Sequence, residues 1–492
     1  MSLINEDCLS LIFEELHDDR SSLYSCLLVN KIWCKFVVPI LWRDPWNFLN
    51  ILKDSTKDKL FLNTLLLHLP EESKNYLKNQ DNNSINIPQQ RHPLFNYVSF
   101  IKYIRQKYKS LDIEIIYNPS YNYELKSLLE QEIYKLLISK CTLKFLDITK
   151  VKCPLYKYPG ATDNLSCICE LHCRSYDDQE LLYGLAQICR FIERLCILYE
   201  NSNPGLANLI EVQKNLKYIK ILVNSFTNFN NVKLKSKCRI IDQAIIKQSH
   251  NLIYLDMPIE NINITFYNEL FPKLVNLQKL ILDGNMLYDT ESEKKLIFST
   301  YPKLQVLLLD SVLFFTAKGV IQNSEGNLQI IWTNNICFST ADQSRNFIQI
   351  ICQNCPRLKY VKLLLKGQYF DEIEQLLMNC QHLEGLYIDA DTQINNRRGD
   401  ELLDKLIKSA PNSLFKIQLN YFEFEMKNFD SFFIKWRCRR SLWLYLNNVN
   451  VKSDDDFKVE FKDLIEKYKN EGVIKKYEFN NSLNFINYYK EL

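Results

Sequence analysis

The chain has 492 residues, of which 47% are hydrophobic and 24% charged, as in an ordinary folded protein. Its formal net charge is only +3, so the composition gives no electrostatic reason to expect binding to nucleic acid or to an anionic membrane. Only 10 residues are glycine, which excludes collagen-like and glycine-rich repeats.

The first residues argue against export. Glu6 and Asp7 lie where a secretory signal would carry basic residues. No stretch approaches the roughly 18 uninterrupted apolar residues that a membrane-spanning helix needs. We therefore expect a soluble intracellular protein, cytoplasmic or nuclear or both, whose 16 cysteines are reduced.

A compact helical module is predicted over residues 1–48. Its first helix shows the i, i+3, i+4, i+7 apolar spacing of an amphipathic helix at Leu9, Ile12, Phe13 and Leu16. Asn5 is a suitable N-cap for this helix. A second helix is expected over 22–30, and a third around Trp33 with an end near Pro39. Three short helices bury little surface, so a partner would stabilise the module.

Residues 49–91 are predicted to be a helical and polar linker. Leu65, Leu66 and Leu67 indicate one helix, which Pro70 would end. The run QDNNSINIPQQ at 80–90 is polar and predicts a loop. We expect this run to separate the helical module from the residues that follow.

From residue 92 onward a leucine-rich unit of the form L-x-x-L-x-L recurs. Its clear copies begin at Leu143, Ile168, Ile192, Leu216, Leu252, Leu277, Leu304, Leu328, Leu358, Leu383 and Leu414, and weaker copies cover 441–446 and 474–479. Most spacings fall within or near the period of about 20–29 residues that is typical of leucine-rich repeats. An apolar helical pattern precedes most copies, so each repeat should hold one helix and one short strand.

The predicted fold class is therefore α/β: a short three-helix module followed by a leucine-rich-repeat solenoid over 92–492. The strands should form a parallel sheet on the concave side and the helices should cover the convex side. A C-terminal cap is expected near 453–492, with an amphipathic helix around Phe461 and a last strand over 474–479.

The strand alternation predicts which side chains face the concave side. In each copy the third and fifth residues and the residue after the sixth point outward. The candidates for substrate binding are Tyr254, Asp256, Lys279, Trp332, Tyr360, Lys362, Tyr387 and Asp389, with Asp283, Asp310, Lys416 and Asn420 on the same surface. Tyrosine and tryptophan often anchor interfaces. The alternative is that these residues only cover the sheet.

The first residues also resemble the F-box motif. The matching positions are Leu3, Glu6, Leu9, Ile12, Phe13, Leu16, Leu23, Leu27, Val29, Asn30, Lys31, Trp33, Leu41, Trp42 and Arg43. Two positions depart from the family pattern, because Ile4 replaces its usual proline and Asn30 its usual cysteine. The match covers about 45 residues, and leucine-rich repeats are often joined to F-boxes.

The resemblance implies a substrate-recruiting adaptor. F-box proteins dock on a Skp-type adaptor and through it on a cullin–RING ubiquitin ligase, while their second domain holds a substrate protein. The docking residues carried over by position are Leu3, Leu9, Ile12, Phe13, Leu16, Leu27, Val29 and Trp33. Two alternatives stay open: the three helices could be a solenoid cap, and the protein could be a leucine-rich-repeat interaction scaffold without a ubiquitin role.

Catalysis, metals and cofactors find no support in the sequence. The six histidines lie in no recognisable nucleophile, zinc or phosphate motif. Two cysteine groups could suggest zinc, at Cys167, Cys169, His172 and Cys173 and at Cys352 and Cys355. Their spacing does not give the two ligand pairs of a structural zinc site, so packing in the core is the favoured interpretation. We expect a non-enzymatic protein without a cofactor, whose partners are proteins.

Overall fold

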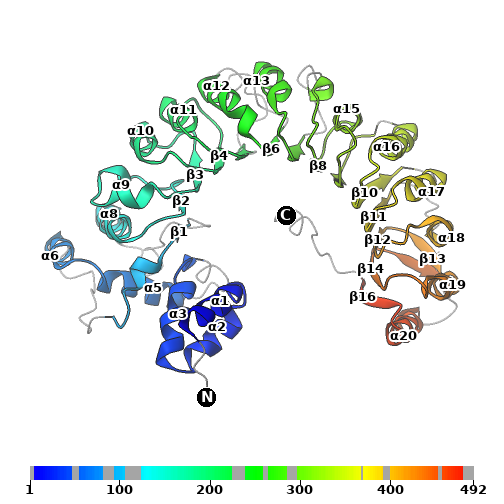
Figure 1. Cartoon of the computed structure of the whole chain (residues 1–492), viewed down its shortest axis with the longest axis horizontal. Helices are drawn as coiled ribbons and strands as arrows, with labels where there is room; N and C mark the ends of the chain where they lie inside the picture. The colour runs from blue at the N-terminus through cyan, green and yellow to red at the C-terminus, as the bar shows by residue number, and fades with distance from the viewer. Residues whose placement is uncertain are drawn as a thin grey trace. The chain divides into compact units, whose positions relative to one another are not determined.

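The computed structural model of the chain divides into two compact units, Met1–Gln248 and Ser249–Leu492, and each is described by itself. Figure 1 shows strands and helices alternating along both units. In each unit the strands lie side by side as a sheet, and the helices cover one face of that sheet. The residues that the structure describes are 5–46, 55–80, 93–105, 123–223, 239–258, 264–284, 296–338, 340–366, 370–391, 399–452 and 457–479.

Three capped helices form the start of the first unit. They are α1 (Glu6–Glu15), α2 (Arg20–Leu27) and α3 (Lys31–Leu41). Before each one, a side-chain oxygen of Asn5, Asp19 or Asn30 accepts a hydrogen bond from a backbone N–H of the first turn. The Asn30 Oδ1 atom lies 2.9 Å from the Trp33 amide nitrogen, so the residue that departs from the F-box pattern starts α3.

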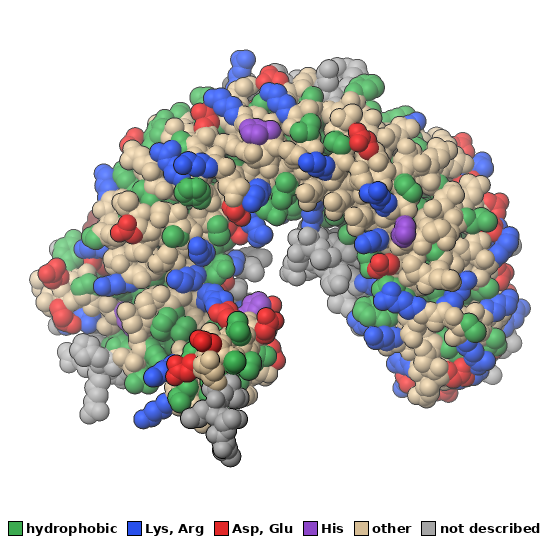
Figure 2. Space-filling model, in the orientation of Figure 1, with side chains coloured by type: hydrophobic (Ala, Val, Ile, Leu, Met, Phe, Trp, Pro, Cys, Tyr) green, Lys and Arg blue, Asp and Glu red, His purple; other side chains and the backbone are tan. Residues whose placement is uncertain are grey.

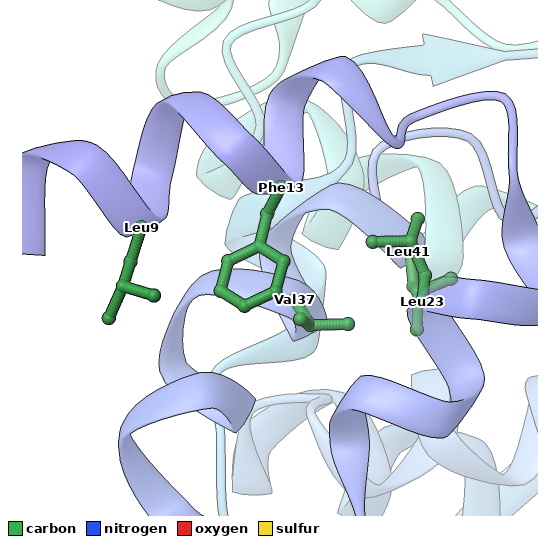
Figure 3. Packing of buried hydrophobic residues seen from close by; sticks show 5 residues of the cluster. All are labelled: Leu9, Phe13, Leu23, Val37 and Leu41. Carbon is green, nitrogen blue, oxygen red and sulfur yellow. The ribbon is translucent and has the colours of Figure 1, made fainter. Parts of the chain in front are cut away.

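The core of this module is small and mainly aliphatic. Figure 3 shows its five buried side chains, which come from all three helices: Leu9, Phe13, Leu23, Val37 and Leu41. The helix α3 ends at Leu41, close to the predicted end near Pro39, and includes Pro39 in its last turn. In the last turn Pro39 removes only one backbone hydrogen bond, and the buried Val38 and Leu41 hold this turn against the core.

Two helices occupy the region that was predicted as a linker. They are α5 (Ser55–Leu67) and α6 (Glu71–Gln80), with Pro70 between them as expected. The leucines Leu62, Leu65 and Leu66 of α5, Leu77 of α6 and Leu69 between the two helices are almost fully buried. The polar run at 80–90 lies outside the described residues except for its first residue, which ends α6.

The residues directly after α3 contact the first strand of the sheet through hydrogen bonds and ring packing. The polar run therefore does not separate the module from the repeats. The short helix η1 (Tyr97–Phe100) and the strand β1 (Tyr103–Ile104) form this junction. The carbonyl oxygen of Arg43 accepts hydrogen bonds from the amides of Lys102 at 2.9 Å and Tyr103 at 3.3 Å. Trp42 packs on Tyr97 with ring centroids 4.6 Å apart.

The first unit continues as a regular array. The strands β1, β2 (Phe145–Asp147), β3 (Glu170–Arg174), β4 (Arg194–Leu198) and β5 (Tyr218–Leu222) pair in parallel in chain order. Its helices are α8 (Tyr123–Lys140), α9 (Ala161–Leu165), α10 (Gln179–Ile188), α11 (Pro204–Glu211) and α12 (Arg239–Gln248), with the 3-10 turn η2 (Leu155–Lys157) before α9.

The second unit repeats the same arrangement. Its parallel strands are β6 (Tyr254–Pro258), β7 (Lys279–Asp283), β8 (Val306–Asp310), β9 (Ile330–Asn334), β10 (Tyr360–Leu365), β11 (Gly385–Ala390), β12 (Lys416–Asn420), β14 (Leu442–Asn447) and β16 (Ile474–Phe479). Its helices are α13 (Ile264–Leu270), α15 (Phe314–Gln322), α16 (Ala341–Asn354), α17 (Phe370–Asn379), α18 (Gly399–Ser409), α19 (Met426–Trp436) and α20 (Phe457–Asn470). A second parallel pair joins β13 (Glu423–Glu425) to β15 (Asn450–Lys452).

The leucine-rich units explain why both arrays form. Every first position of the eleven clear copies is buried at 0–1% exposure, between the strands and the helices. A single repeat cannot cover this apolar face, so stacking on a neighbour is required. The predicted fold class is confirmed: the repeats form an α/β leucine-rich-repeat solenoid. The two weaker copies also form strands: β14 covers 442–446 of the first copy, and β16 covers the second.

Candidate functional site

Six large apolar side chains lie on the surface of the α1–α3 module. They are Leu11, Ile12, Tyr24, Leu28, Val29 and Ile32, which we call the helical surface. Leu28 is the most open, with 89% of its area exposed. Figure 2 shows hydrophobic side chains reaching the surface over this module, next to acidic ones. Several large apolar side chains left exposed on so small a module are consistent with a protein-binding surface.

The predicted docking residues divide into three groups. Ile12 and Val29 are exposed on the helical surface, whereas Leu16, Leu27 and Trp33 are half-buried against the module's core. Leu9 and Phe13 belong to the core itself, so they position the helices and do not face outward. Leu3 lies outside the described residues.

Sequence reasoning missed four members of the helical surface, which are Leu11, Tyr24, Leu28 and Ile32. A usable signal existed for Leu11, because it lies off the inward stripe that runs through Leu9 and Phe13. A large apolar residue on the outward side of an amphipathic helix has no partner within its own module. The prediction followed the family motif, so on α1 it chose residues of the inward stripe and left out Leu11.

The strand face of the second unit is the second candidate surface. The register of the strands aligns its outward residues in rows, so that Asp256, Ile281, Leu308 and Trp332 follow one another on β6 to β9. Ile281, Leu308, Trp332 and Tyr387 form an apolar cluster, and the rings of Trp332 and Tyr387 meet edge to face at 4.7 Å. Half-buried Tyr254, Val306, Ile330 and Tyr360 pack around this cluster.

Lysines cover parts of the cluster and are held by aromatic rings. Lys362 Nζ lies 3.1 Å from Asp389 Oδ2 and 2.8 Å from Asn334 Oδ1, and it stands 5.6 Å from the centroid of the Trp332 ring. Such contacts fix the side chain by charge pairing and by cation–π attraction together. The Lys362 ammonium is therefore presented in a defined position on this face.

A second lysine is enclosed more tightly. Lys416 is 5% exposed, and its Nζ lies 5.6–5.8 Å from the ring centroids of Tyr387, Trp443 and Tyr445. Burial lowers the pKa of Lys416 to about 8, and the neighbouring charge of Lys476 acts in the same direction. This end of the strand face therefore carries a buried lysine among aromatic rings.

Only half of the predicted strand-face residues are accessible. Tyr254, Tyr360, Lys362 and Asp389 are half-buried and can touch a partner. Asp256, Lys279, Trp332 and Tyr387 are buried, because the long side chains on this face lean on one another. Lys416 and Asn420 are buried too, whereas Asp283 is exposed and Asp310 half-buried.

The cysteine groups lie in the repeats as ordinary packing residues. Cys173 and Cys355 are buried, and desolvation raises the pKa of both thiols. Cys169 Sγ lies 3.3 Å from the carbonyl oxygen of Lys144. Within the described ranges, no three His, Cys, Asp or Glu side chains are grouped so that they could hold a metal ion. None of the helices described here is long and apolar enough to cross a membrane.

Distant similarities relate the chain to solved structures. No family model matches the chain, and no curated protein matches it significantly. One similar chain, from the crystal structure of the Rad7 and Elc1 complex in yeast, is 13% identical with a TM-score of 0.36, and the match covers 86% of this chain and 94% of that one. Another, the leucine-rich repeat-containing protein LegL7 from Legionella pneumophila, is 12% identical with a TM-score of 0.35, covering 56% and 89%. Similarity at this level carries no argument about function.

Proposed function

We propose that the chain is a non-enzymatic adaptor whose α1–α3 module binds a Skp-type subunit of a cullin–RING ubiquitin ligase and whose repeats hold a substrate protein. One observation carries this proposal: six large apolar side chains remain exposed on a module whose core is already formed by other residues. Covering them with a partner would remove apolar area from water at about 25 cal/mol per Å². The F-box resemblance supplies the class of partner.

The departures from the F-box pattern do not weaken the proposal. Asn30 caps α3 through its hydrogen bond to the Trp33 amide, so its replacement of cysteine helps the helix to start. Ile4 lies outside the described residues, but α1 begins at Glu6 with Asn5 as its cap. The helices that carry the motif therefore form without the two family residues.

The substrate side of the proposal rests on the strand face of the second unit. Tyr254 and Tyr360 are half-buried there and pack against the apolar cluster, and the paired Lys362 and Asp389 lie on β10 and β11, near Tyr360. Aromatic side chains are enriched at the centres of protein interfaces, whereas charged side chains are depleted there and polar ones form the rim. We infer that this face contacts the substrate.

The test compares two leucines that are matched in exposure. Leu28→Asp changes the helical surface at an 89% exposed position, and Leu94→Asp changes an 86% exposed leucine of the same unit outside that surface. Burying a leucine is worth about 2 kcal/mol, so Leu28→Asp should weaken binding of the full-length chain to a purified Skp-type subunit at least about 30-fold. Leu94→Asp should bind like the wild type in the same titration. Equal affinities for both variants, or no binding by the wild type, would contradict the proposal.

A second function is favoured by a specific contact. The Arg43 carbonyl continues the ladder of β1, and Trp42 packs on Tyr97, as expected of a cap at the end of a solenoid. In that case the protein is an interaction scaffold without a ubiquitin role. Affinity purification would then recover the same partners with the wild type and with Leu28→Asp, whereas the adaptor loses its ligase subunits and keeps its substrate.

A further inference from the structure

The second unit has a strongly basic edge where its last three strands begin. The stretches 410–418, 437–445 and 471–478 hold the turns before β12, β14 and β16 and the first residues of these strands. They contain six cations and two acids, which are Lys416, Arg437, Arg439, Arg440, Lys475 and Lys476 against Glu471 and Glu478. The net charge of this edge is therefore +4, and counting Glu384 from the turn before β11 still leaves +3. Figure 2 shows Lys and Arg side chains gathered over these last repeats.

Two of the six cations are used within the fold. Arg437 Nη2 lies 2.8 Å from Glu471 Oε2, so this pair is neutral. Arg439 donates to the carbonyl oxygens of Ala410 at 2.7 Å and Ile407 at 3.3 Å, at the end of α18. The helix dipole stabilises a cation at this place, so Arg439 needs no other ligand.

Three other cations of this edge are exposed, namely Arg440, Lys475 and Lys476. Lys476 Nζ lies 3.0 Å from Glu478 Oε1, whereas among the described residues Arg440 and Lys475 form no ion pair. One carboxylate is therefore paired with three exposed cations, and the edge keeps an unbalanced positive charge at its surface. The composition hides this charge, because acids elsewhere in the chain reduce the total to +3.

A β-bulge presents the two lysines. The register of β14 and β16 shifts by one residue just before Trp443, which pairs with Lys476, so Lys475 is the extra residue of β16. Bulges of this kind re-aim side chains and are common at the edges of sheets. Without the bulge Lys476 would lie opposite Leu444, whose side chain is buried in the core. The bulge therefore keeps both lysines at the surface.

Aromatic rings lie between these cations. The Arg440 Cζ atom stands 3.6 Å from the centroid of the Phe415 ring, so the guanidinium lies over the face of that ring. Phe415 meets Trp443 edge to face at 5.8 Å, and Lys476 Nζ is 5.9 Å from the centroid of the Trp443 ring. Both rings are half-buried, whereas Arg440 is exposed. The edge therefore combines cations held on rings with a flat guanidinium that a planar group of a ligand can contact.

We propose that this edge binds single-stranded nucleic acid, with phosphates at Arg440, Lys475 and Lys476 and a base stacked on the Arg440 guanidinium. Single strands are bound by cationic surfaces that follow the backbone, together with aromatic or arginine planes on which bases stack. The bases of a duplex already stack on one another, and the carboxylates of an acidic peptide would use the cations but not the plane. This site does not depend on the proposed ligase role.

The test titrates fluorescein-labelled oligo-dT and oligo-U with the full-length chain and follows fluorescence anisotropy. Each phosphate contact to a single strand contributes about −0.7 to the slope of log K against log salt concentration. Three contacts should therefore weaken binding about 20-fold when the salt concentration is raised fourfold. Binding of either strand at low salt with this dependence supports the proposal, and the tighter of the two distinguishes DNA from RNA.

Two double variants with the same change of charge separate this edge from the rest of the surface. Arg440→Gln with Lys475→Gln leaves one phosphate contact, so the same rise in salt should weaken binding only about threefold. The matched control is Lys427→Gln with Lys462→Gln, at exposed lysines of α19 and α20 in the same unit, and it should keep the 20-fold effect. All four side chains are exposed, so the fold should tolerate both pairs of changes.

A single variant tests the stacking plane. Arg440→Lys keeps the charge and removes the planar guanidinium, so affinity should fall at least about fivefold while the salt dependence stays the same. No binding of either strand at low salt would overturn the proposal, as would tighter binding of a duplex or of a labelled polyglutamate peptide. An equal loss of salt dependence in both double variants would overturn it too. Leu28→Asp should leave strand binding unchanged, so failures of this proposal and of the adaptor proposal are distinguishable.

Discussion

At the scale of single residues, Asp242 is a carboxylate that the repeats bury, and its surroundings disfavour the ionised form. It is 3% exposed on α12, and the Tyr199 hydroxyl donates a hydrogen bond to its carboxylate. Burial raises the pKa of Asp242 to about 6, although the hydrogen bond from Tyr199 acts in the opposite direction. The sequence alone shows that Asp242 is an acid on an apolar helix. It does not show that the hydroxyl of Tyr199, from a preceding repeat, is the hydrogen-bond partner of this acid.

The raised pKa predicts that Asp242→Asn stabilises the first unit at pH 7.5. Because the folded-state pKa lies above the unfolded value near 3.8, the protonated form stabilises the fold below pH 4, and this contribution is lost as pH rises through about 6. Asparagine keeps the hydrogen bond from Tyr199 without the charge, and the gain should be about 1–3 kcal/mol. Thermal melting of the full chain at pH 4 and pH 7.5 measures it. If the two proteins differ equally at both pH values, desolvation of the carboxylate is not the cause.

At the scale of elements, the sequence predicts the strands well because each L-x-x-L-x-L copy fixes its own alternation. All copies from Leu143 onward lie at or directly before a strand, and the inward positions are buried. The predicted helical stripe of α1 is confirmed in part: Leu9 and Phe13 are in the core and Leu16 packs against it, whereas Ile12 is exposed. Contacts between elements are not predictable in this way, because the alternation shows which way a side chain points and not which residue it contacts. Two examples are the hydrogen bonds that the Arg43 carbonyl accepts from the β1 region and the packing of Trp332 on Tyr387.

The N-cap of α3 gives a prediction at this scale. Asn30→Ala removes the acceptor of the Trp33 amide and should cost about 1 kcal/mol of helix stability. Hydrogen exchange should then be about fivefold faster for the amides of Lys31–Leu41. The control is Asn96→Ala, because Asn96 occupies the equivalent position before η1 but makes no capping hydrogen bond with its side chain. Equal exchange in both variants would show that the cap is not what starts α3.

At the scale of the whole molecule, the α1–α3 module is structurally part of the first unit, so removing it should have two effects. The end of α3 provides the Arg43 carbonyl to two amides at β1, and Trp42 covers Tyr97. Asp44 accepts a hydrogen bond from Arg105 Nε at 2.6 Å, just after β1. A partner lost on deletion of residues 1–46 could therefore reflect either the missing helical surface or a loosened first repeat.

Hydrogen exchange separates these two effects. Deletion of residues 1–46 leaves the Lys102 and Tyr103 amides without their acceptor, so we expect faster exchange in β1 and β2. Leu28→Asp changes an 89% exposed side chain, so it should leave exchange in these strands unchanged while it removes binding to the Skp-type subunit. The strands β8 and β9 of the second unit serve as the internal control in both samples. If β1 and β2 exchange at the wild-type rate after the deletion, the module is only tethered to the array, and truncation becomes a clean test of docking.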